Sequence, residues 1–195
     1  DRYKLLLPEG ALFRDFYCDA IIRRGIKSFI APQITIGSTS EGLKRNVTLK
    51  IKSDLEGDEL NNKTIMVKIA SNGTTSPVSG IYKDGWYSSS ISSFGTYSLM
   101  IDSIAPVIEN ITTSYDSVYN CPVLEVKVSD NFSGIKNYSC TINNKWYLAE
   151  YDKKNSTIYV LLNRFTENEF NFKIDLTDVC GNTIIFSKEI ILVPK

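Results

Sequence analysis

The side chains that most often catalyse reactions or hold metals are scarce in this sequence. It contains no histidine, and its 22 Lys and Arg residues balance 22 Asp and Glu residues. Without histidine, the chain alone cannot supply a Ser-His-Asp triad, a Cys-His pair or a His-ligated zinc site. The phosphate-binding motifs GxGxxG and GxxxxGK[ST] and the nucleophile motif GxSxG are also missing. The sequence therefore predicts a protein that is not an enzyme and that carries no cofactor.

Two acidic turns are candidate calcium sites. Asp130 opens the turn Asp130–Gly134, and Asp178 opens the turn Asp178–Asn182. Carboxylate oxygens in loops suit calcium, so Asp130 and Asp178 are candidate ligands. The alternative is a local role, in which each Asp accepts hydrogen bonds from its own turn and the glycine adopts a positive φ. Neither turn has the oxygen density of an EF-hand loop, so the sequence favours the local role over a metal.

Two Trp-Tyr pairs are the candidate binding residues. They are Trp86 with Tyr87 and Trp146 with Tyr147. Exposed aromatic rings can stack on the apolar faces of sugars. Adjacent residues of a strand point to opposite faces, so only one ring of each pair can be exposed. The alternative is that one ring of each pair packs in the core and the other is ordinary surface, which is the commoner arrangement.

The four cysteines, Cys18, Cys121, Cys140 and Cys180, show no CxxC spacing. This argues against a zinc ribbon or a thioredoxin-like motif. Cys121 and Cys140 are expected at the same end of one domain, so a disulfide between them is conceivable. Buried free thiols are the alternative, and the sequence favours them.

Period-two alternation of apolar and polar residues predicts the elements that hold these side chains. It is clearest in four runs: Val47–Lys52, Ile65–Ile69, Leu124–Val128 and Phe170–Thr177. Such runs are typical of strands with one buried face. Turn-forming pairs such as Asp84-Gly85 separate the strands at intervals of about ten residues, as in sandwich folds. At most one turn of helix is expected, between Glu9 and Asp19, because Gly10 weakens a longer one.

A domain boundary is predicted just before Pro106. The Ala105-Pro106 step is extended and Pro106 cannot donate to a sheet, which suits a short linker that enters an edge strand. Each side has about 100 residues, the size of one sandwich. We therefore expect an all-β fold of two tandem β-sandwich domains. Residues 1–103 form the first, ZU5-like or Ig-like, and residues 104–195 form the second, Ig-like with Greek-key connections.

The strands expected in these domains can be given individually. The second domain should contain seven: 107–113, 122–129, 135–142, 146–151, 156–163, 169–177 and 183–192. The last three strands of the first domain should be Val78–Tyr82, Trp86–Ile91 and Thr96–Ile101.

Charge and hydropathy exclude two classes of partner. A net charge of zero gives no basic surface of the kind that a nucleic-acid binder needs. The apolar run Leu5–Leu7 is too short for a signal-peptide core, and a membrane helix needs about 20 apolar residues. The sequence therefore predicts no nucleic-acid partner and no membrane span in this chain.

Several blocks of sequence carry a family resemblance. In the second half they are Asp-x-x-Ser-Gly-Ile within Val128–Ile135, Lys-Trp with Glu-Tyr-Asp within Asn144–Asp152, and Asp with Gly-Asn within Asp175–Asn182. This half resembles a bacterial Ig-like module of the C-terminal regions of secreted M23-family (lysostaphin-type) peptidases. In the first half, two blocks resemble the module that precedes it, and a third resembles the opening of a ZU5-like β-domain: Gly80–Trp86, Phe94–Tyr97 and Leu7–Leu12.

The resemblance implies a function without a catalytic residue. M23 peptidases cleave peptide crosslinks of the cell wall with a zinc ion held by histidine and aspartate, and this chain has no histidine. It therefore implies a non-catalytic accessory module of an exported bacterial protein, one that spaces or orients a flanking catalytic domain of the same polypeptide. The implied location is extracytoplasmic: periplasmic, outer-membrane-attached or secreted. The alternative is an adhesin-like surface module that binds a protein or a cell-wall or surface glycan.

Overall fold

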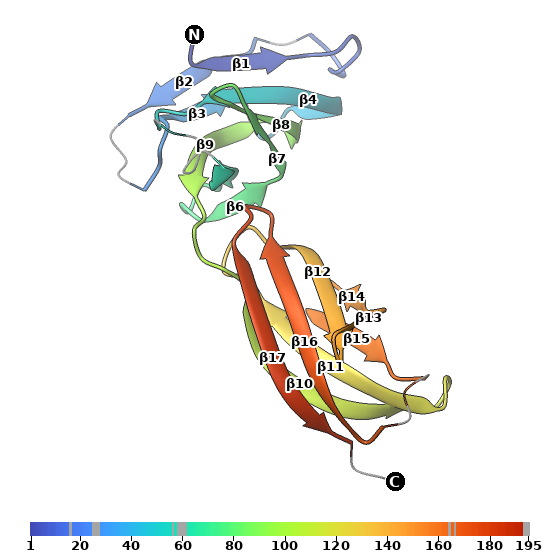
Figure 1. Cartoon of the computed structure of the whole chain (residues 1–195). Helices are drawn as coiled ribbons and strands as arrows, with labels where there is room; N and C mark the ends of the chain where they lie inside the picture. Colours follow the sequence, from blue (N-terminus) through green and yellow to red (C-terminus); the bar gives the residue numbers. More distant parts are fainter. Residues whose placement is uncertain are drawn as a thin grey trace. The chain divides into compact units, whose positions relative to one another are not determined.

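The computed structural model describes residues 1–15, 17–24, 28–55, 57, 62–163, 165 and 167–192. These residues form an all-β protein with strands β1 to β17 (Figure 1), so the predicted fold class is confirmed. The chain divides into two compact units, Asp1–Ser103 and Ile104–Lys195. No helix in the described part is long and apolar enough to cross a membrane.

The first unit contains two antiparallel sheets. One has the order β1 (Tyr3–Leu6), β4 (Gly42–Lys52), β8 (Trp86–Ser93), β7 (Gly80–Lys83). The other has the order β2 (Ala20–Arg23), β3 (Gln33–Ile36), β9 (Gly95–Ile101), β5 (Thr64–Ile69), β6 (Thr75–Val78). Fully buried side chains come from both sheets and make the core of a sandwich; they include Leu49, Ile51, Ile65, Met66 and Leu99.

Glu9 and Gly10 form a turn in the segment Glu9–Asp19, where one turn of helix was the most that the sequence allowed. Ala11 donates its N–H to the carbonyl of Pro8 at 3.1 Å, and Leu12 makes an isolated antiparallel bridge with Leu43. The turn therefore feeds directly into sheet pairing. Phe16 lies outside the described residues.

The single strand expected at Val78–Tyr82 is wrong, because the chain changes sheets inside it. β6 ends at Val78 and pairs with β5, whereas β7 begins at Gly80 and pairs with β8 in the other sheet. A Cβ atom at Gly80 would collide with the carbonyl oxygen of Ser88 and the ring of Tyr87. Only glycine fits where the backbone crosses this closely to β8.

The second unit has the Ig arrangement. One sheet has the order β10 (Val107–Asp116), β11 (Cys121–Ser129), β15 (Thr157–Leu161), β14 (Glu150–Asp152). The other has the order β13 (Lys145–Tyr147), β12 (Ile135–Ile142), β16 (Glu169–Asp178), β17 (Thr183–Ile191), and β16 and β17 form its long hairpin (Figure 1). These orders correspond to strands A-B-E-D and C-F-G of an Ig domain, with β13 as an additional strand beside C.

The strand expected at 146–151 is also wrong, and for the same reason as in the first unit. β13 pairs with β12, and β14 pairs with β15 in the opposite sheet. The two residues between them, Leu148 and Ala149, carry the chain across. Asn143 and Asn144, which precede β13, have φ angles of 49° and 64°, as a two-residue type I′ hairpin turn requires.

All four cysteines are free thiols, so the alternative of a Cys121–Cys140 disulfide is not the one that the structure adopts. Cys121 lies on β11 and Cys140 on β12, in different sheets. Burial, with a smaller contribution from the negative charge of Asp175, raises the pKa of Cys140 to about 12. This thiol therefore stays protonated at neutral pH and is a poor nucleophile.

Alkylation should distinguish the exposed thiol from the buried ones. At about pH 8, iodoacetamide is expected to modify Cys18 readily, because Cys18 is exposed and only an accessible thiolate reacts. Cys121, Cys140 and Cys180 are buried and should react only after unfolding in urea. Mass spectrometry of the labelled chain measures this. Rapid native labelling of Cys140 would contradict its position in the core.

Candidate functional site

A cavity of about 530 Å³ lies beside β13 in the second unit. It is a product of the sheet crossing, because Trp146 and Leu148 come from β13 and the crossing residues, and Glu150 begins β14. Further lining residues come from the β10–β11 turn, from β11 and from β15 and the residues that follow it. Its volume is within the range of about 300–1,000 Å³ that small-ligand pockets occupy.

Among the described residues, four aromatic side chains line the cavity: Tyr119, Trp146, Tyr147 and Tyr159. Trp146 is 67% exposed and Tyr119 is 62% exposed, so their faces are accessible to a ligand. The hydroxyl of Tyr147 is buried and has no hydrogen-bond partner among the described residues. Tyr147 packs against the core cluster of this unit, so its hydroxyl is not part of the surface that a ligand would meet.

Two carboxylates complete the lining. Asp116 Oδ1 accepts the backbone N–H groups of Val118 at 2.7 Å and Tyr119 at 2.9 Å. These bonds hold the β10–β11 turn in the conformation that presents Tyr119. Glu150 is exposed at the start of β14. No lysine or arginine lines the cavity in the part of the chain that the structure describes.

Of the sequence candidates, Trp146 and Tyr147 line this cavity, and Trp86 and Tyr87 lie in the other unit. Tyr87 is 3% exposed in the core of the first unit. Trp86 is half-buried, and the Nζ of Lys4 lies 4.5 Å from its ring centroid. That cation–π contact already uses a face of the ring, so Trp86 is a poorer stacking surface than Trp146.

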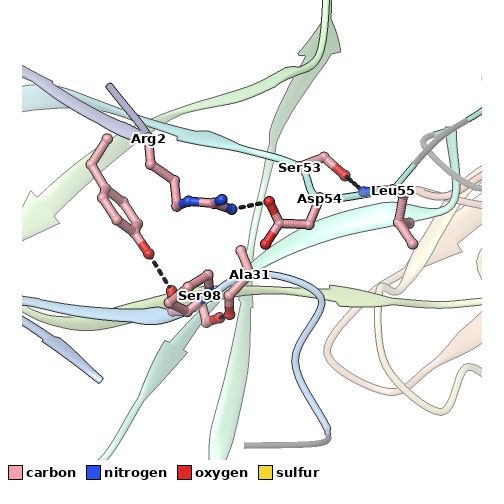
Figure 2. Close-up of polar contacts among 8 residues, drawn as sticks. Arg2, Ala31, Ser53, Asp54, Leu55 and Ser98 are labelled. Carbon is pink, nitrogen blue, oxygen red and sulfur yellow. Dashed lines mark hydrogen bonds and ion pairs between the residues drawn. The ribbon is translucent and has the colours of Figure 1, made fainter. Parts of the chain in front are cut away.

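The first unit has a polar hollow at its amino-terminal end, close to Asp54. Arg2 and Asp54, which both line it, form an ion pair, and Leu55 donates its N–H to the hydroxyl of Ser53 at 3.1 Å (Figure 2). Nearby, the hydroxyl of Ser98 on β9 donates a hydrogen bond to the carbonyl of Ala31, just before β3, at 2.7 Å (Figure 2). Arg2 and Asp54 are both partly exposed, and an exposed ion pair of this kind contributes little to stability.

The two candidate calcium ligands lie close together in the second unit. A carboxylate oxygen of Asp130 and one of Asp178 are within 4.8 Å of each other, and the turns are joined by a bond from the N–H of Val179 to the carbonyl of Gly134 at 3.0 Å. Oδ1 of Asp130 is buried and has no hydrogen-bond partner among the described residues. Calcium binding stays the alternative to the predicted local role.

The hydrogen bonds of both aspartates fit the local role. Oδ2 of Asp130 accepts the N–H groups of Phe132 and Gly134 at 3.0 and 2.6 Å. Asp178 accepts the backbone N–H of Asn182 at 2.8 Å and its side-chain Nδ2–H at 2.7 Å. Each carboxylate thus satisfies donors of its own turn, as aspartates in tight turns commonly do.

Sequence reasoning missed Tyr119, Tyr159, Asp116 and Glu150. The only local signal was Tyr119, a large aromatic residue in a turn, where no core requires it. The other three are ordinary strand residues until the sheet crossing brings them near Trp146.

The first unit is a β-sandwich of two antiparallel sheets. The chain belongs to the Zu5-like domain family, whose model matches residues 1–102. The match covers nearly all of that unit, and it agrees with the resemblance of Leu7–Leu12 to the opening of a ZU5-like domain. No curated protein matches the chain.

Proposed function

We propose that the chain is a non-catalytic accessory module of an exported bacterial protein and that its second unit binds a glycan in the cavity beside Trp146. The observation that carries the proposal is the exposure of Trp146, which is 67% accessible at a cavity of about 530 Å³. A large aromatic ring left in water beside a concave surface is a common mark of a ligand site.

The chemistry of the lining suits a sugar. The C–H groups on one face of a pyranose ring are apolar and slightly positive, and they pack against the electron-rich face of an aromatic ring. The hydroxyl groups of a sugar are donors, and the carboxylates of Asp116 and Glu150 accept hydrogen bonds.

The wider part of the proposal concerns the parent protein. The resemblance of residues 128–135, 144–152 and 175–182 to modules of M23-family peptidases supports an extracytoplasmic protein in which these two sandwiches space or orient a zinc peptidase domain outside this chain. The complete open reading frame tests this part. Zinc-ligating histidines in a neighbouring domain would support it, and their absence would leave only the binding role.

Binding can be measured with Trp146 itself. The chain has two tryptophans, so Trp86→Phe leaves Trp146 as the only indole fluorophore. Titration with peptidoglycan fragments and neutral polysaccharides is expected to shift its emission saturably. In calorimetry, Trp146→Ala should weaken the same binding by about tenfold or more, as loss of a central aromatic contact does.

The control for this experiment is Trp86→Phe, which should bind as the unsubstituted chain does. Binding that survives Trp146→Ala unchanged, or no saturable response to any glycan, would overturn the proposed function.

A further inference from the structure

The charge of the cavity selects among sugars. Its described lining contains the carboxylates of Asp116 and Glu150 and no basic side chain, although the chain as a whole has a net charge of zero. Like charges that line a concave, partly apolar surface concentrate a negative potential there. These two carboxylates would attract a cationic group.

The aromatic rings favour the same kind of ligand. The faces of Trp and Tyr rings carry negative charge density and attract ammonium groups. Tyr119 and Trp146 are the most exposed rings of the lining, and Asp116 and Tyr119 belong to the same hydrogen-bonded turn. A carboxylate and exposed rings, which both attract an ammonium group, therefore line the same cavity.

Asp116 is held in place for this interaction. Its two described hydrogen bonds, from Val118 and Tyr119, both go to Oδ1. The carboxylate is therefore oriented before a ligand arrives, which lowers the entropic cost of binding. Glu150 is exposed, so its side chain can change rotamer to pair with an amine at different positions in the cavity.

We infer that the cavity binds amine-bearing sugars, hexosamine residues that are not N-acetylated, in preference to neutral or acidic sugars. The inference rests on the proposed function, because it names the class of glycan that the same site takes. Trp146 stacks on the sugar ring, and Asp116 and Glu150 pair with the protonated amine.

The test compares three oligosaccharides of equal length on the full chain with the Trp86→Phe substitution. They are oligomers of glucosamine, N-acetylglucosamine and galacturonic acid, titrated at about pH 6, where sugar amines are protonated. Trp146 emission and calorimetry give the affinities. The glucosamine oligomer should bind about tenfold more tightly than the N-acetylated one, and the galacturonate oligomer most weakly.

Two variants separate a specific amine contact from general attraction of a polycation. Glu150→Gln keeps the size of the side chain and removes its charge, so it should reduce the preference for the glucosamine oligomer to about threefold or less. Its affinity for the N-acetylated oligomer should change by less than about twofold. The matched control is Glu189→Gln, whose side chain is exposed on β17 and which should leave the preference unchanged.

The outcomes distinguish failure of the amine preference from failure of glycan binding itself. Equal affinity for the amine and N-acetyl oligomers, or a preference that Glu150→Gln and Glu189→Gln reduce equally, overturns the inference and leaves glycan binding standing. Failure of all three oligomers and of the peptidoglycan fragments to shift Trp146 emission overturns the proposed function itself.

Discussion

Replacing Phe172 with alanine is expected to lower the free energy of unfolding of the second unit by about 4 kcal/mol. Phe172 is 0% exposed on β16, in the core cluster that includes Ile142, Val160 and Ile174. Removing the ring loses its burial and leaves a cavity that the surrounding strands cannot close, because β16 is paired on both sides by β12 and β17. The loss is a large part of the stability of a domain this size.

Urea titration with thiol labelling measures this effect in the second unit alone. Cys140 belongs to the same core cluster, so the urea concentration at which it becomes reactive reports the opening of this unit. The control is Asn171→Ala, because the neighbouring Asn171 side chain is exposed and its loss should change the free energy of unfolding by less than about 0.5 kcal/mol. An effect of Phe172→Ala below about 1 kcal/mol would show that the core is not packed as described.

Replacing Asp178 with alanine is expected to cost about 3 kcal/mol in the same unit. The side chain is 0% exposed, and it accepts two hydrogen bonds from Asn182. Without the carboxylate, the N–H and Nδ2–H groups of Asn182, which is itself buried, lose these acceptors. The same titration measures the change, with Glu189→Ala as an exposed control that should have little effect.

Melting temperatures of the unsubstituted chain and of Asp178→Ala decide between the local role of these aspartates and calcium binding. If the carboxylates serve only their turns, the melting temperature should be equal in calcium and in a chelator. A higher melting temperature in calcium that Asp178→Ala abolishes would contradict the purely local role and would support a metal site at Asp130 and Asp178.

The clearest match between sequence pattern and burial is in a strand with partners on both sides. In Phe170–Thr177 the apolar residues are buried and the polar residues between them are at least partly exposed, because β16 is an inner strand of its sheet and each face has a fixed environment. The turns at Asp84-Gly85 and Asn143-Asn144 were predictable because positive φ angles demand particular residues.

The two wrong strands fail for a common physical reason. Alternation records which way a side chain points, and says nothing about which neighbour the backbone pairs with. At Ser79 and at Leu148-Ala149 the chain leaves one sheet and enters the other, yet the residues on both sides still look like strand. The glycine at position 80 was visible in the sequence, but its meaning depends on β8.

Some residues of the candidate site could be predicted from the sequence and others could not, for the same reason. Trp146 and Tyr147 could be named from residue type and from the rule that adjacent strand residues face opposite ways. Tyr119 and Tyr159 could not be connected to them, because their proximity depends on contacts between segments that are far apart in the sequence.

In each sandwich, one short segment of backbone pairs with both sheets. The segments Thr75–Lys83 and Lys145–Asp152 each hydrogen-bond to one sheet at their beginning and to the opposite sheet at their end. Beside each crossing, separating the two layers would first require the pairing on one side of the crossing to break. A force applied to one sheet is therefore passed to the other through a connection of only one or two residues, Ser79 in the first unit and Leu148-Ala149 in the second.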